Sequence, residues 1–211
     1  MRTRTDNQLS IERYRRHAAG YDRSAERTMA LRLRTIALLQ LHPGDVVLDV
    51  GAGTGLSYEP LLAGVGPSGR VLAFEQSPEM FEQARGRVER QGWPNVWHAC
   101  APAETVVLPQ LADALLFNYT HDILRTPAAL DNILRQARPG ARIAVAGMKF
   151  FPWWTGPLNL VAWLKNRPYN VLAADMRRPW DLVQAQCREF HVTATQAGMG
   201  YIAHGRRRSE P

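Results

Sequence analysis

Lysine, cysteine and long apolar runs are scarce in this chain of 211 residues. Only Lys149 and Lys165 are lysines, so the formal net charge of +7 rests almost entirely on arginine. Cys100 and Cys187 are too few for a disulfide framework or a cysteine-based zinc site. No apolar run approaches the ~20 residues that cross a bilayer, and the amino terminus lacks the apolar segment of a secretory signal. We therefore expect a cytoplasmic protein.

The length fits a single domain with a substantial core, and 45% of the residues are hydrophobic, as in ordinary globular proteins. The arginines gather near both ends of the chain, and such a charge attracts nucleic acid, anionic lipid or an acidic substrate. No RRM, KH or zinc-finger motif accompanies them. We expect no nucleic-acid partner, and the sequence leaves the oligomeric state open.

Strand-like and helix-like segments alternate through the middle of the chain, which predicts parallel strands joined by right-handed helical crossovers. Apolar runs and turn residues predict seven strands, at 46–50, 70–75, 95–99, 112–118, 141–147, 189–196 and 200–206. Helical spacing and capping residues predict helices at about 24–40, 54–62, 77–92 and 126–137. The stretch 150–180 is rich in aromatic residues and proline.

The most informative stretch is VLDVGAGTG, Val47 to Gly55, where an apolar run is broken by glycines at every second position. Each glycine lacks a Cβ at a place where the backbone turns sharply and approaches another group closely. Asp49 comes just before the turn, and Glu75 ends the next predicted strand. Because ligands of open parallel sheets bind outside the carboxyl ends of the strands, both carboxylates are candidate ligand contacts.

The spacing of Asp49, the glycines and Glu75 resembles the class I S-adenosylmethionine-dependent methyltransferases. The resemblance implies an α/β three-layer sandwich, with a seven-stranded, mostly parallel sheet of order 3-2-1-4-5-7-6 and helices on both faces. It also implies that residues 1–40 form a helical cap over the active site. Residues 41–211 would form the methyltransferase core, with 150–180 as an aromatic lid.

The same resemblance implies where S-adenosylmethionine would bind. The backbone of the glycine turn would admit its methionine and ribose parts, Asp49 would hold the amino end, and Glu75 would accept hydrogen bonds from the ribose hydroxyls. Gln76 would pack along the adenine, Ala103 and Glu104 would read its edge, and Tyr21 would fold over the cofactor. The implied cofactor contacts are Tyr21, Asp49, Gly51, Gly53, Gly55, Glu75, Gln76, Ala103, Glu104 and Asn118.

Methyl transfer from a sulfonium needs alignment and a nucleophile free of its proton, so a phenol or alcohol acceptor benefits from a general base. His121 follows the fourth predicted strand and is the first candidate base, with a substrate contact or a helix start as alternatives. We expect substrate choice to lie in Tyr119 to Leu124, in the amino-terminal helix and in the aromatic segment, with Tyr119, Trp153 and Trp154 in contact with substrate. No metal-ligand set is visible, so no metal is expected.

These features predict a methyltransferase acting on N or O of a small apolar or aromatic metabolite. One alternative is a phospholipid or lipid-headgroup N-methyltransferase whose basic amino-terminal helix makes peripheral contact with an anionic membrane. The sequence is also compatible with a cofactor-binding protein without catalysis, with a Rossmann dehydrogenase and, as a weaker option, with a methyltransferase of RNA or protein.

Overall fold

The computed structural model describes residues 28–149 and 177–209. Its strands are β1 (Val46–Val50), β2 (Arg70–Glu75), β3 (Val96–Cys100), β4 (Ala112–Asn118), β5 (Ala137–Met148), β6 (Cys187–Thr195) and β7 (Gly200–Arg207). Its helices are α2 (Met29–Ala37), α3 (Tyr58–Val65), α4 (Pro78–Gln91), α5 (His121–Arg125), α6 (Pro127–Arg135) and α8 (Asp181–Ala185), with a 3₁₀ turn, η3, at Gln196–Gly198.

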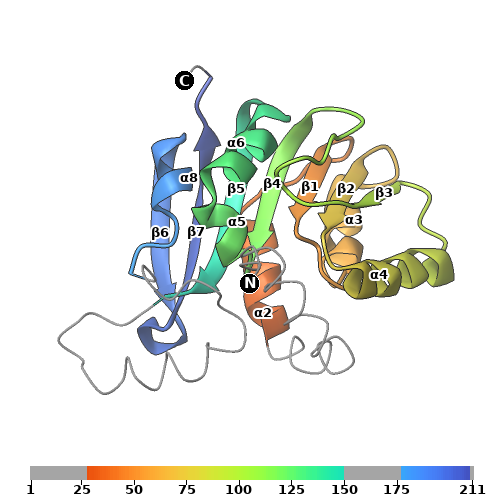
Figure 1. Cartoon of the computed structure of the whole chain (residues 1–211), viewed down its shortest axis with the longest axis horizontal. Coiled ribbons are helices and arrows are strands. Elements are labelled where there is room, and N and C mark those ends of the chain that lie inside the picture. The colour runs from red at the N-terminus through yellow and green to blue at the C-terminus, as the bar shows by residue number, and fades with distance from the viewer. Residues whose placement is uncertain (1–27, 150–176, 210–211) are drawn as a thin grey trace, which may run out of the picture.

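The seven strands form one sheet of order β3-β2-β1-β4-β5-β7-β6 (Figure 1). Strands β1 to β5 pair in parallel, whereas β7 runs antiparallel to both β5 and β6. The strand order and the mostly parallel sheet that the resemblance implied are therefore confirmed.

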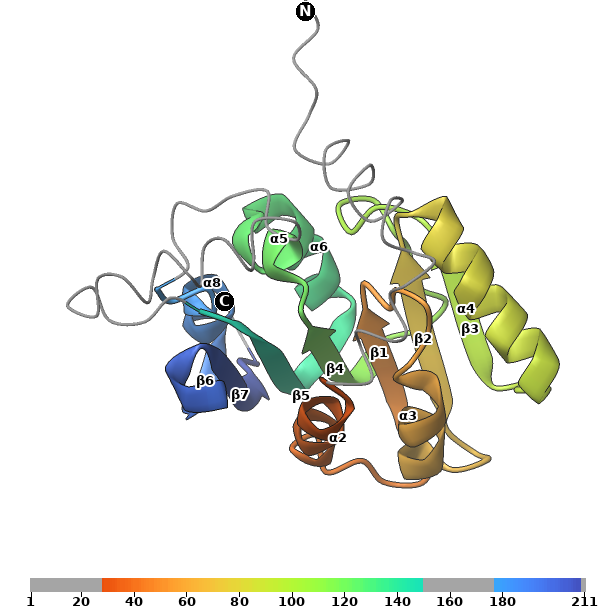
Figure 2. The ribbon, with the colours of Figure 1, turned by 90° about the horizontal axis from the view of Figure 1, so that it is seen from below.

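Helices cover the sheet on both faces, as Figure 2 shows for α2 and α3 on one side and α5, α6 and α8 on the other. The core is accordingly split in two, and β1 contributes to both halves because successive side chains point to opposite faces. Val47 packs with residues of α2, α3 and α4, while Leu48 and Val50 pack with residues of α5, α6 and α8. This burial on both faces explains the nearly continuous apolar sequence of the central strands.

Helix α4 ends where its capping residues predict. The Ser77 hydroxyl accepts a hydrogen bond from the Met80 amide, and Pro78 occupies the first turn. At the other end Gly92 takes the left-handed conformation, with φ of 63°. This helix places Met80 beside the end of β2, where the functional site lies.

Other predicted boundaries were wrong by a few residues. The helix expected from about residue 54 begins only at Tyr58, because the glycine turn and the residues after it are coiled in successive tight turns. The strand expected at 141–147 begins already at Ala137, and it pairs with β4 on both sides of an irregularity before Arg142. The short helices α5 and α8 were not predicted.

The two segments predicted to close the site lie mostly outside the described residues. Only residues 28–40 of the predicted cap and 177–180 of the predicted lid are described. Trp180, at the end of that lid, is buried, and its ring centroid lies 4.6 Å from that of Tyr201. Trp180 therefore belongs to the core under α8. Within 28–149 and 177–209, no helix is long and apolar enough to span a membrane.

Candidate functional site

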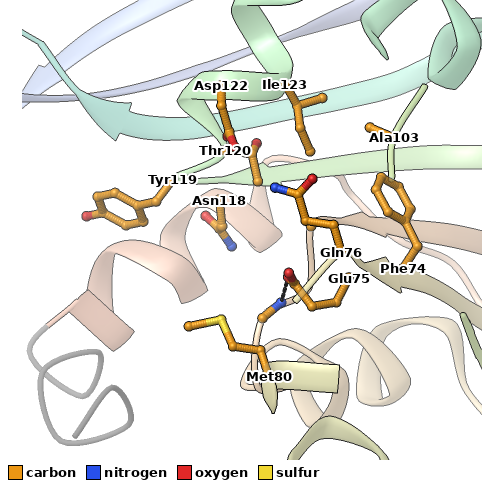
Figure 3. A pocket seen from close by; sticks show the side chains of 12 residues that line it. Phe74, Glu75, Gln76, Met80, Ala103, Asn118, Tyr119, Thr120, Asp122 and Ile123 are labelled. Carbon is orange, nitrogen blue, oxygen red and sulfur yellow. Dashed lines mark hydrogen bonds between the residues drawn. The ribbon is translucent and has the colours of Figure 1, made fainter. Parts of the chain in front are cut away.

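A recess opens at the carboxyl ends of β1, β2 and β4, with about 470 Å³ of empty space that is continuous with solvent (Figure 3). The recess is lined by Gly51, Gly53, Phe74, Glu75, Gln76, Met80, Ala103, Asn118, Tyr119, Thr120, Asp122 and Ile123. It lies where an open parallel sheet is expected to bind its ligand.

The glycine turn forms one wall of the recess. Gly51, Gly53 and Gly55 have φ angles of 61°, 60° and 78°, a left-handed region that L side chains adopt at a cost. A Cβ on Gly51 would lie 2.8 Å from Cγ2 of Thr120, so a side chain there would collide with the opposite wall. Gly55 does not line the recess, and a Cβ there would instead lie 2.7 Å from the Tyr58 ring.

Glu75 lies at the centre of the site, buried at the end of β2. Its Oε2 accepts a hydrogen bond from the Gly53 amide at 2.9 Å, and its Oε1 accepts one from the Ser77 amide at 2.8 Å. Each carboxylate oxygen has a second lone pair, so Glu75 can still accept hydrogen bonds from a ligand. The glutamate thus joins the glycine turn to the start of α4 and presents an acceptor to the recess (Figure 3).

Several buried polar atoms at this edge of the sheet have no partner within the described residues. They are Oδ2 of Asp49, both amide atoms of Asn118 and Oγ1 of Thr120. Because leaving a buried polar group unpaired costs free energy, such a cluster indicates a place where a polar ligand completes the hydrogen bonds. An ammonium group would suit the Asp49 carboxylate, and ribose hydroxyls would suit Glu75. These polar groups therefore fit the amino-acid and ribose parts of the cofactor that the sequence resemblance implies.

The recess is acidic although the protein as a whole is basic. Burial raises the pKa of Glu75 from 4.5 to about 7, the backbone hydrogen bonds oppose this rise, and the nearby Asp122 carboxylate adds to it. Burial likewise raises the pKa of Asp49 from 3.8 to about 6, against the lowering effects of Arg32 and Ser57. Carboxylates held at this cost favour a ligand that carries positive charge.

The raised pKa of Glu75 predicts how stability depends on pH without ligand. A carboxyl whose pKa rises on folding stabilises the protein below its unfolded value and loses that contribution as the pH rises through the folded value. We expect the free energy of unfolding to fall between about pH 4.5 and pH 7. Glu75→Gln should flatten this slope when urea unfolding is followed at several pH values. An identical slope in the variant would contradict the burial of an ionisable Glu75.

His121 begins α5, and its ring turns away from the recess towards β5 and β7. Nε2 accepts a hydrogen bond from the Met148 amide at 3.1 Å, which places the ring proton on Nδ1. Nδ1 is buried and unpartnered within the described residues, and burial together with Arg125 lowers the pKa of His121 to about 4. Neither nitrogen offers a free lone pair in this arrangement, which disfavours the role of general base.

The remaining predicted contacts divide into three groups. Gln76, Ala103, Asn118 and Tyr119 line the recess. Asp49, which is buried, and Glu104, which is exposed, are not among the lining residues. Tyr21, Trp153 and Trp154 lie outside the described residues, so their predicted roles stay predictions.

Sequence reasoning missed Phe74 and Met80 as lining residues, whereas Thr120, Asp122 and Ile123 fall in the segment that was expected to determine substrate choice. Phe74 and Met80 fit the apolar patterns of β2 and α4. Such a pattern does not distinguish a residue at the edge of the core from one inside it. Thr120, Asp122 and Ile123 follow β4 directly, and the carboxyl end of a central strand is the signal that predicted this segment. Tyr119, just before them, has a φ of 60°, a strained conformation for a residue with a side chain.

Comparison with known sequences gives matches over the glycine turn and the strands that follow it. The family model described as "Methyltransferase domain" matches residues 47–140. A protein-L-isoaspartate O-methyltransferase of Aeropyrum pernix is 34% identical over 112 residues, which are 53% of this chain and 42% of that protein. A demethylmenaquinone methyltransferase of Symbiobacterium thermophilum is 27% identical over 172 residues, which are 67% of this chain and 64% of that protein. The matches thus span less than two thirds of either relative.

Comparison with solved structures shows that the fold is shared. The N-methyltransferase NodS from Bradyrhizobium japonicum, in complex with S-adenosyl-L-homocysteine, has a TM-score of 0.67 at 15% identity, over 94% of this chain and 98% of that one. A SAM-dependent methyltransferase from Aquifex aeolicus has a TM-score of 0.63 at 23% identity, over 83% and 89% of the two chains.

Proposed function

We propose that this protein, whose residues 47–140 belong to the methyltransferase domain family, is an S-adenosylmethionine-dependent methyltransferase. The family match and the sheet order confirm the class I, Rossmann-like resemblance seen in the sequence. The observation that carries the proposal is Glu75, buried at the end of β2 and hydrogen-bonded to Gly53 of the glycine turn. The Glu75 carboxylate is thus a fixed hydrogen-bond acceptor beside glycine backbone that carries no side chains, as a ribose-bearing ligand requires.

The residues of the recess have distinct roles under this proposal. Glu75 accepts hydrogen bonds from the ribose hydroxyls, and Asp49 and Asn118 meet the polar atoms of the amino-acid part. Met80, Phe74 and Ala103 form the apolar part of the lining. S-adenosylmethionine, when bound, supplies a methyl group on a positively charged sulfonium. The carboxylates around the recess favour that positive charge.

The chain's contribution to the chemistry is alignment and exclusion of water. Tyr119, Thr120 and Ile123 form the part of the lining beyond Asn118, and we propose that they orient the acceptor atom. Because both nitrogens of His121 are engaged or protonated, catalysis through proximity is favoured over general-base catalysis. The acceptor then reaches the site as a neutral amine or as an anionic oxygen and needs no proton acceptor from His121.

We propose a small apolar or aromatic metabolite as the methyl acceptor. Tyr119 and Ile123, in the part of the lining beyond Asn118, support this class, as does the similarity to a demethylmenaquinone methyltransferase. Incubation with methyl-labelled cofactor and fractionated metabolite extracts tests the proposal, and label in a small apolar product is expected. Label in phospholipid instead, together with sedimentation on anionic liposomes, would favour the lipid-headgroup alternative. Absence of label from every fraction, despite cofactor binding, would favour a binding protein without catalysis.

His121→Ala separates the two views of this histidine. We expect turnover on an acceptor found in that screen to fall less than about tenfold, far below the ~10²–10⁴-fold contribution of a general base. Any step near pH ~6.5 in the wild-type profile should persist in the variant, since Glu75 and Asp49 titrate in that range while the His121 ring is held neutral. A loss of a hundredfold or more, with disappearance of such a step, would restore His121 as the base. Affinity for S-adenosylhomocysteine serves as the control and should be unchanged.

A further inference from the structure

A buried arginine, Arg32, reaches from α2 towards the glycine turn. Its side chain is 5% exposed, and its Nη1 donates a hydrogen bond to Oγ of Ser57 at 2.6 Å. A guanidinium withdrawn from water is costly unless it is paired with other groups. Arginines that serve only solubility stay exposed, as Arg34 does two residues further along the same helix. The burial of Arg32 therefore calls for a specific partner.

Ser57 connects Arg32 to Asp49. Ser57 is fully buried at the amino-terminal cap position of α3, where a serine side chain ordinarily accepts a hydrogen bond from its own helix. Here its side chain makes no such capping bond. Its Oγ accepts the hydrogen bond from Arg32, and its hydrogen bond to the Asp49 carboxyl, near the end of β1, lowers the pKa of that carboxyl. The three buried side chains form a relay from α2 to the turn.

Asp49 keeps one oxygen available. Oδ2 of Asp49 is buried and has no partner among the described residues. An uncompensated carboxylate in such a place would tend to take up a proton and would then lose its attraction for a cation. A buried positive charge nearby prevents this without occupying Oδ2. Arg32 is the cation that acts on this carboxyl.

We propose that Arg32 is a positioning residue of the cofactor site, which acts through Ser57 to keep Asp49 ionised and oriented so that its free oxygen receives the cofactor's ammonium group. The inference rests on the proposed function, since it assigns a role within the same site. It gives α2 a part in ligand binding although none of its residues lines the recess. The coupling runs through contiguous contacts between α2, the start of α3 and the end of β1.

The titratable groups around Asp49 allow the effect of Arg32 on ligand affinity to be tested by varying the pH. Burial raises the pKa of Asp49, and Arg32 and Ser57 lower it, so that it lies at about 6. Burial raises the pKa of Tyr58 of α3, and the charges of Asp49 and Glu75 add to this rise, so the phenol stays neutral. Glu75, across the turn, titrates in the same range. Because Glu75 is present in every variant below, ratios of affinity at one pH isolate the contribution of Asp49.

The experiment uses calorimetry to measure the affinity of the full chain for S-adenosylhomocysteine at about pH 6.5, 7.5 and 8.5. Arg32→Met removes the charge and keeps much of the volume. We expect it to weaken binding about tenfold or more at the lowest pH, and the deficit to shrink at the highest pH, where Asp49 ionises without help. Ser57→Ala, a small change that breaks the relay, should show the same trend in weaker form. Arg32→Lys should recover most of the affinity, and the control Arg34→Met should bind as the wild type.

A double-mutant cycle tests whether the effect of Arg32 passes through Asp49. If it does, Arg32→Met should cost less than about threefold when added to Asp49→Asn. Additive losses, or a loss of equal size at every pH, would overturn the proposal and leave Arg32 with a purely structural role. If Arg32→Met does not fold, Ser57→Ala and its combination with Asp49→Asn carry the same test. Failure of the wild type itself to bind S-adenosylhomocysteine would refute the proposed function instead.

Discussion

Replacing Gly53 by valine is expected to abolish binding of S-adenosylhomocysteine. Gly53 has a φ of 60°, lines the recess, and donates its amide hydrogen to Glu75. A β-branched side chain is strained in this left-handed region by about 1–2 kcal/mol, and its methyl groups would enter the space of the ligand. Calorimetry with the purified variant should detect no binding at concentrations that saturate the wild type.

Gly92→Val provides the matched control for this prediction. Gly92 has a nearly equal φ of 63° at the end of α4, and a Cβ there would meet no atom within 4 Å. The two variants carry a similar backbone strain, but only Gly53 faces the recess. We expect Gly92→Val to lose stability and to keep its affinity. Normal binding by Gly53→Val would mean that the glycines form only a tight turn, and the assignment of the site would fail.

The second large effect is expected at Glu75. Glu75→Ala removes a buried acceptor for the ribose hydroxyls, and hydrogen bonds to charged groups contribute about 1.5–3 kcal/mol. The dissociation constant for S-adenosylhomocysteine should therefore rise by about 10- to 150-fold. The variant also leaves the amides of Gly53 and Ser77 without their acceptor, so a lower melting temperature should accompany the loss.

Glu104→Ala is the control for Glu75. Glu104 is exposed and off the recess, so its replacement should leave the affinity unchanged. An unchanged dissociation constant in Glu75→Ala, measured on folded protein, would mean that the end of β2 does not hold the ligand. A large loss in Glu104→Ala would restore the adenine-edge contact that the sequence resemblance implied.

The centre of the sheet was predictable because β1, β2 and β4 are buried on both faces. Apolar runs such as Val46–Val50 and Arg70–Glu75 are bounded by glycine or proline, and the local pattern alone defines them. The two carboxylates of the site were predictable for a related reason. Asp49 and Glu75 occupy the ends of neighbouring parallel strands, and that topology brings them to one edge of the sheet.

The role of His121 was not predictable, because it depends on a distant part of the chain. The hydrogen bond from Met148 that occupies Nε2 joins residues 27 positions apart, and it forms only after β4 and β5 pair. Gly55 gives a similar lesson. Its spacing from Gly53 suggested a ligand contact, whereas the space it leaves is filled by the Tyr58 ring. The spacing of glycines predicts a turn, but it does not predict which of these glycines face the ligand.

The direct test of the central claim is calorimetric titration of the wild-type chain with S-adenosylhomocysteine and, separately, with NAD. The geometry of Glu75, Asp49 and the glycine turn predicts saturable binding of S-adenosylhomocysteine with one site per chain and no measurable binding of NAD. The heat signal should vanish in Gly53→Val and persist in Gly92→Val. Tighter binding of NAD, or no binding of S-adenosylhomocysteine by the folded protein, would contradict the account.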